Sequence, residues 1–140
     1  MKRLFNPSFN PDRLDLILLF ARIAVGCFML VHGLPKLEKW MAGGEIEFAD
    51  PLGVGAKTSL LLVVIAEVVC SILLILGFAT RLALVFLLFT MIIVAFIIHS
   101  LEPFEAKEKA FLYLTIFGLL FITGSGRYSV DYLLYSRLNK

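Results

Sequence analysis

The sequence predicts an all-α membrane protein, a bundle of four transmembrane helices, within a chain of 140 residues. Hydrophobic residues make up 60% of the chain and charged residues 17%, whereas a soluble domain is about 45–50% apolar and about 25% charged. A soluble domain of this size has too little interior to bury so much apolar surface. The apolar runs also lack the period-two alternation of a membrane barrel, so they indicate helices that satisfy their own backbone hydrogen bonds in lipid.

A helix needs about 20 apolar residues to cross the hydrocarbon core of a bilayer. The runs expected to span are residues 14–34, 58–78, 82–99 and 108–124. The first run is interrupted by Asp15, Arg22 and His32, and the second only by Glu67. The fourth is short and spans only if Lys109 extends toward the interface, and a tilted or partly re-entrant helix is the alternative. Residues 1–140 are predicted to form a single membrane domain.

The connections between these runs carry turn signals. Residues 77–81 predict a tight turn between the second and third spans, and Pro103 breaks the chain between the third and fourth. Residues 35–57 form the only long outer loop and contain Trp40 and Phe48, so this loop is either an interfacial cap or a lid. Segment 1–15 is polar, and the long apolar run that follows it lacks a small-residue cleavage site, so we expect the segment to remain as an interfacial strap.

The distribution of basic residues predicts the orientation of the chain. Seven lie on the side of the termini: Lys2, Arg3, Arg13, Arg81, Arg127, Arg137 and Lys140. Five lie on the opposite side: Lys36, Lys39, Lys57, Lys107 and Lys109. Because cytoplasmic loops carry an excess of Lys and Arg, both termini are predicted to be cytoplasmic.

Two charged residues lie deep inside the apolar runs. Arg22 lies about 12 Å into the first run and Glu67 about 16 Å from the end of the second, at 1.5 Å per residue. A lone charge at such a depth costs several kcal/mol, so we expect Arg22 and Glu67 to form a buried ion pair. The pair either locks the two helices together or forms part of a proton or ligand site. Gly26, Gly33 and Ser71 would let these helices approach closely.

A second polar cluster is expected at the outer ends of the helices: His32, Lys36, His99 and Glu108. These side chains could hydrogen-bond the carbonyl oxygen of a quinone, with the histidines exchanging protons near neutral pH. They could bind a metal, although their separation in sequence predicts no metal geometry, so none is assigned. Histidines at helix ends are also common as interfacial or capping residues.

The opposite, cytoplasmic end carries the segment Gly124-Ser-Gly-Arg-Tyr-Ser-Val-Asp131. Its glycines are expected to end the fourth helix. Asp131 could pair with Arg81 or Arg127, which favours a structural role for these three residues. No phosphate-loop motif follows a strand here.

Several classes of function are disfavoured by what the sequence lacks. Cys27 and Cys70 form no CxxC motif, which argues against a thiol oxidoreductase of the thioredoxin type, and the sequence leaves open whether they pair. No CxxCH motif for haem is present, and both histidines lie at helix ends. A net charge of +2 is too small to indicate a nucleic-acid partner.

Together these motifs resemble the DoxX family of small bacterial inner-membrane proteins. The resemblance rests on Arg22-Ile-Ala-Val-Gly26, His32-Gly33, Lys36-Leu37, Ala66-Glu67, Gly77, Thr80-Arg81, Ala95, His99, Glu108-Lys109-Ala110 and Gly124 to Asp131. It covers residues 16–134, and their order and spacing carry it rather than any single motif. Ser125 stands where family members often have proline, which should alter only the turn. The resemblance implies a four-helix fold in a bacterial inner membrane.

The resemblance also implies a redox setting, because relatives named DoxD are linked to a thiosulfate:quinone oxidoreductase and others to thiol-stress complexes. The leading hypothesis is therefore a membrane subunit of a redox or stress-response system, with a quinone or other lipophilic ligand held among His32, Lys36, His99 and Glu108. An oligomeric transporter or channel, with Glu67 titrating in a polar cavity, is one alternative. A structural assembly subunit without a site is another. Expected partners are the lipid bilayer, further copies of the chain or a redox subunit.

Overall fold

The structure is a computed structural model that describes residues 11–139, and this part of the chain is helical without a strand, as predicted. The elements are α1 (Pro11–Ala42), α2 (Ala56–Val64), η1 (Ile65–Val69), α3 (Cys70–Leu76), α4 (Thr80–Ile93), η2 (Val94–Ile98), α5 (Phe104–Thr123) and α6 (Val130–Leu138). The stretches η1 and η2 are π-helical, and they continue the α-helices beside them. Thus α2, η1 and α3 form one rod, and α4 and η2 form another. Lys2, Arg3, Lys140 and most of the expected N-terminal strap lie outside the described residues.

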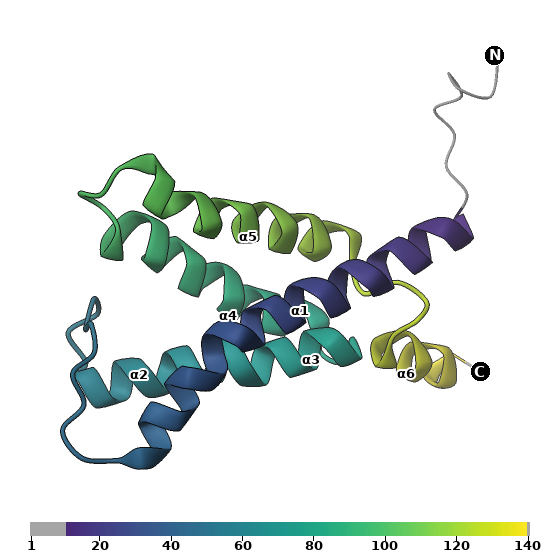
Figure 1. Cartoon of the computed structure of the whole chain (residues 1–140). Helices are drawn as coiled ribbons and strands as arrows, with labels where there is room; N and C mark the ends of the chain where they lie inside the picture. The colour runs from purple at the N-terminus through teal and green to yellow at the C-terminus, as the bar shows by residue number, and fades with distance from the viewer. Residues whose placement is uncertain (1–10, 140) are drawn as a thin grey trace.

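The helices run between two ends of the molecule, which we call the N/C end and the loop end (Figure 1). The N/C end contains the beginning of α1, the Gly77–Ala79 turn and α6. The loop end contains the connection 43–55 and the turn between η2 and α5. The rod containing α2 and the rod containing α4 diverge from the N/C end toward the loop end, and α5 runs beside α4. The loop end is therefore where space opens between helices.

Three helices of the described chain are long and apolar enough to cross a membrane: Asp12–Ala42, Ala56–Leu76 and Thr80–Ile98. The chain is thus a multi-pass membrane protein. The predicted count of four spans is not confirmed. The first turns of α5 carry Glu105, Lys107, Glu108 and Lys109. These charged residues make the beginning of α5 more polar than the three apolar helices.

The long outer loop is shorter than predicted, because α1 continues through Pro35 to Ala42. Proline in a helix removes one backbone hydrogen bond and crowds the preceding turn, which made residue 35 the expected end. The turns after Pro35 instead bury apolar side chains. Leu37 and Trp40 pack against a cluster of Leu60, Val64 and Val68, and this packing outweighs the local cost of proline.

The connection 43–55 folds back onto the helices. Ile46 and Phe48 pack on the same apolar cluster as Trp40. Asp50 accepts hydrogen bonds from the backbone N–H groups of Val54 and Gly55 and from the Ser59 hydroxyl, at 3.0, 2.7 and 2.6 Å. These bonds fix the loop to the first turn of α2.

The antiparallel register of α1 against the α2–η1–α3 rod is visible at two glycines. A Cβ atom built on Gly26 would lie 2.5 Å from Cγ1 of Ile75, and one on Gly33 would lie 3.0 Å from Cβ of Glu67. The expected close approach at Gly26 and Gly33 is therefore confirmed. Elsewhere in this packing Cys70 is buried, while Cys27 is exposed on α1, and both thiols are free.

Candidate functional site

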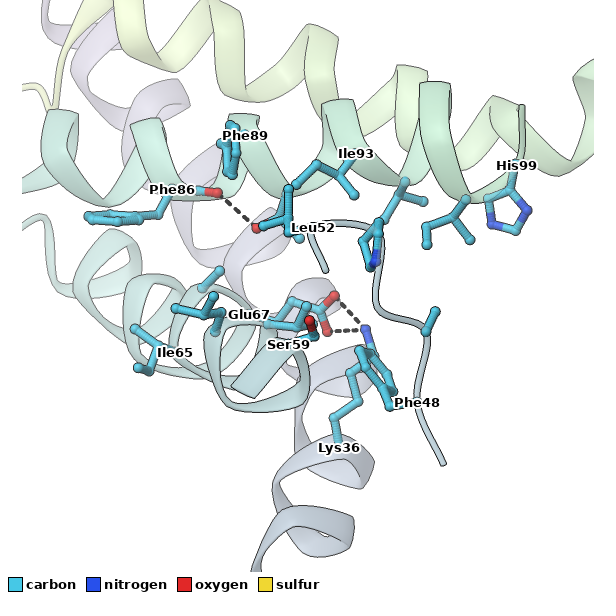
Figure 2. Close-up of a pocket in the computed structure, with 18 residues that line it drawn as sticks. Lys36, Phe48, Leu52, Ser59, Ile65, Glu67, Phe86, Phe89, Ile93 and His99 are labelled. Atoms are coloured by element: carbon cyan, nitrogen blue, oxygen red, sulfur yellow. Dashed lines mark hydrogen bonds and ion pairs between the residues drawn. The ribbon is translucent and has the colours of Figure 1, made fainter. Parts of the chain in front are cut away.

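The polar centre of the membrane region is a half-buried ion pair between Lys36 of α1 and Glu67 of η1. The Lys36 ammonium donates to both carboxylate oxygens of Glu67, with Nζ–O distances of 2.5 and 2.6 Å (Figure 2). The Glu67 side chain is 2% exposed and that of Lys36 is 30% exposed. A buried carboxylate is costly without such a partner. The pair therefore neutralises the only acidic residue of the second apolar helix.

This partner corrects the expectation that Glu67 pairs with Arg22. Arg22 is fully buried at the N/C end, where its Nη2 donates to the Tyr128 carbonyl oxygen at 2.5 Å and its Nη1 lies directly beside Gly77. Glu67 lies at the level of Gly33, which is eleven residues, or about 16 Å of helix, away from Arg22. Depths measured from the end of each apolar run do not compare directly between the two helices, because α1 begins well beyond the end of α3 (Figure 1).

Three of the four predicted ligand residues line one cavity at the loop end. His32, Lys36 and His99 border a space of about 230 Å³, together with Glu67, Lys109 and Tyr113. The rings of His32 and Tyr113 meet edge to face with centroids 6.1 Å apart. His99 places Nδ1 2.9 Å from Oε2 of Glu102, just after η2. We call this space the polar cavity.

Glu108, the fourth predicted ligand residue, is exposed on α5 and is not among the residues that line the polar cavity. Consecutive residues of a helix point in directions about 100° apart, and Lys109, although exposed, borders the polar cavity instead. Tyr113, which the prediction missed, lies one turn beyond Lys109 on the same face. That four-residue spacing is the signal that could have identified it.

A larger cavity of about 430 Å³ lies beside the polar cavity, between the α2–η1 and α4–η2 helices. Figure 2 shows Phe86, Phe89 and Ile93 on one side of it and Ile65 and Glu67 on the other. Phe48 and Leu52, from the connection 43–55, also border it, with Phe48 beside Lys36 and Leu52 toward Ile93. We call this space the apolar cavity. Because residues of the connection 43–55 line this cavity, the connection is part of the site. The sequence alone left open whether this loop is an interfacial cap or a lid.

The predicted residues of the cytoplasmic end fall in a separate region, at the N/C end. Asp131 accepts hydrogen bonds from the backbone N–H groups of Ala79 and Thr80 at 2.8 and 3.0 Å, and so caps the beginning of α4. The expected pairing of Asp131 with Arg81 or Arg127 is thus replaced by a backbone cap. Arg81 is exposed. These contacts tie α6 to the α3–α4 turn.

Arg127 contributes a second set of contacts at the N/C end. Its side chain lies 3.2 Å from the Asp12 carboxylate and 3.4 Å from that of Asp15, and its backbone N–H donates to Asp15 at 3.0 Å. The segment before α6 is thereby fastened to the first turns of α1. Within residues 11–139, no group of three or more His, Cys, Asp or Glu side chains is placed to hold a metal ion.

The fold and this site define a class: a multi-pass helical membrane protein with a neutralised ion pair between two cavities. The sequence model of the DoxX family matches residues 17–100, which is more than half of the chain. The chain therefore belongs to the DoxX family. The match contains Arg22, His32, Lys36, Glu67 and His99, whereas α5 and α6 lie outside it. No curated protein and no solved structure matches the chain significantly.

Proposed function

We propose that this DoxX-family protein is the membrane subunit of a redox or stress-associated system and binds a quinone or similar lipophilic ligand at its loop end. One observation carries the proposal: His32, Lys36 and His99 border a single cavity around a buried carboxylate. Ligand sites are typically apolar hollows with a few convergent polar groups. Here the apolar part is supplied by the neighbouring helices and the polar part by this cluster.

The chemistry of the cluster suits a carbonyl ligand. An imidazole N–H or the Lys36 ammonium can donate a hydrogen bond to a quinone oxygen, and an imidazole can pass a proton near neutral pH. Because the Glu102 carboxylate accepts from Nδ1 of His99, the Nε2 atom of a neutral His99 ring can accept a hydrogen bond from the hydroxyl of a reduced quinone, and in the imidazolium form it can donate to a quinone oxygen. A separate redox subunit would exchange electrons with the quinone, and the residues named here would bind and orient the ring.

The proposal includes a placement of the chain in the membrane. We propose that α5 is a fourth span whose charged first turns, from Glu105 to Lys109, lie at the interface beside the loop end. Residues 1–140 would then form one domain. With both termini cytoplasmic in a bacterial inner membrane, the polar cavity would open near the outer face. A redox partner or a second copy of the chain would contact the remaining apolar surface.

Quinone binding to the purified full-length protein tests the proposal. We expect the His32→Ala/His99→Ala double variant to lose binding of a benzoquinone by about tenfold or more, since each lost hydrogen bond to a ligand costs about 1 kcal/mol or more. Glu108→Ala is the matched control, because Glu108 is exposed at the same end and is not among the residues lining the polar cavity. Equal binding by the double variant and the parent protein, with both folded, would contradict the proposal.

A further inference from the structure

We infer that the ligand is a tailed amphiphile, whose hydrocarbon tail occupies the apolar cavity while its ring lies at the Lys36–Glu67 pair. This inference rests on the proposed function and adds the class of ligand and its route. Four residues border both cavities: Lys36, Glu67, Val94 and His99. The ion pair and the His99 imidazole thus form the wall that a ring and a tail would share.

The apolar cavity offers polar groups to a ligand only near this wall. Its lining includes the hydroxyls of Ser59 and Thr90, but both donate to protein oxygens already. Ser59 Oγ donates to Asp50 at 2.6 Å, and Thr90 Oγ1 donates to the Phe86 carbonyl at 2.9 Å. Neither hydroxyl therefore has a hydrogen left to donate to a ligand oxygen, and the side chains of the lining that can still donate one are Lys36 and His99, beside the Glu67 carboxylate. A ligand that fills this space must therefore be apolar along its length and polar at the end beside these three residues.

The lining also indicates how such a ligand would enter. Leu62, Ile65, Phe86 and Phe89 border the cavity and are 40–54% exposed, on helices that are apolar enough to span the membrane. In a bilayer these side chains would contact lipid, so the opening between the two rods faces the hydrocarbon. The connection 43–55 closes the loop-end side through Phe48 and Leu52 (Figure 2). Entry is therefore lateral, from the membrane.

A tail that moves from lipid into this cavity gains little hydrophobic free energy, because lipid chains are as apolar as the cavity wall. The tail would instead be selected by fit, and the volume of about 430 Å³ lies within the usual range of ligand pockets. Narrowing the cavity should therefore reduce binding of a tailed ligand and spare binding of the same ring without a tail.

The test compares two probes on the full-length protein in one detergent: a dimethoxy-methyl-benzoquinone with a decyl tail, and the same ring without a tail. The test variant is Val63→Trp. Val63 lines the apolar cavity and is not among the residues that line the polar cavity. Val85→Trp is the matched control, because Val85 is 49% exposed on α4 and belongs to neither lining. We expect Val63→Trp to lower retention of the tailed probe about tenfold relative to Val85→Trp, because the indole would occupy space that the tail needs.

Ala49→Phe narrows the same cavity from the exposed connection, and it provides a second variant if Val63→Trp does not fold. Unchanged retention of the tailed probe in a folded narrowing variant would overturn the inference. Equal loss of both probes would also overturn it, because ring and tail would then share one space. If either of these two results is found while the His32→Ala/His99→Ala variant still loses binding of the probes, the inference fails and the proposed function is retained. If neither probe binds the parent protein, both the proposed function and this inference fail.

Discussion

Lys36 and Glu67, 31 positions apart in the chain, meet with Nζ 2.5 and 2.6 Å from the two carboxylate oxygens. The two partners differ in their access to solvent: Glu67 is 2% exposed and Lys36 is 30% exposed. An unpaired Glu67 carboxylate would have no other described partner, whereas an unpaired Lys36 could reach the surface. The pair is therefore asymmetric, and its two halves should respond differently to mutation.

Removal of the lysine should be the more damaging change. We expect Lys36→Met to lower the free energy of unfolding by about 3 kcal/mol, because it leaves a buried carboxylate unpaired. Glu67→Met should cost less, and the Lys36→Met/Glu67→Met double variant should be more stable than Lys36→Met alone. Denaturant unfolding in detergent measures this order, with Lys57→Met as a control at an exposed lysine of the same end. Equal loss in the double variant and in Lys36→Met would show that the charge pair is not the cause.

A second prediction compares the loss of stability at two glycines with the same φ angle, one of which lies in the turn between α3 and α4. Gly77 and Gly43 both have a φ of +68°, but only Gly77 is crowded, by Arg22 and Ser129. Gly43→Ala should cost about 1–2 kcal/mol for the left-handed conformation alone. Gly77→Ala should cost clearly more, because its methyl group displaces the buried guanidinium. Thermal unfolding of both variants checks this, and equal melting temperatures would contradict the described packing.

Attachment of the connection 43–55 should depend on pH through Asp50. Hydrogen bonds from Ser59 and from the backbone N–H groups of Gly55 and Val54 hold the pKa of Asp50 below its ordinary value of 3.8. The stabilisation is therefore fully present above pH 3.8 and is lost as the pH falls through the lower pKa of the folded state. Amide exchange of residues 50–59 should rise on acidification below that value.

The matched variants isolate this effect of pH. Asp50→Asn should show fast exchange in this segment at neutral pH and little further change with acid. Glu45→Gln, an exposed acidic residue of the same connection, should behave like the parent protein. If Glu45→Gln reproduces the effect of Asp50→Asn, the Asp50 hydrogen bonds do not anchor the segment.

Local signals in the sequence were sufficient for the helical class and for several helix ends. Gly77 ends α3 in the left-handed conformation, with Phe78 N–H bonded to the Leu73 carbonyl at 3.0 Å, as expected of a glycine that ends a helix. Gly124 ends α5 in the same predicted role. These positions were predictable because a positive φ is a local requirement that selects glycine.

The errors at Pro35 and Arg22 depended on contacts between distant segments. Pro35 was expected to end a helix, but packing of Leu37 and Trp40 on α2 keeps the helix intact. Arg22 was expected beside Glu67, but the partner of Glu67 is set by how far α1 extends past α3. Such registers depend on the packing of whole helices, so single residues and their spacing could not supply them.

The most direct test of the central claim is the mass of the full-length protein extracted from its membrane in mild detergent, recorded under non-denaturing conditions. The account predicts a stoichiometric excess over the bare chain, which solvent extraction identifies as a tailed quinone and which His32→Ala/His99→Ala loses. A bare chain, or the same excess in the folded double variant, would contradict a ligand site at Lys36, Glu67 and His99.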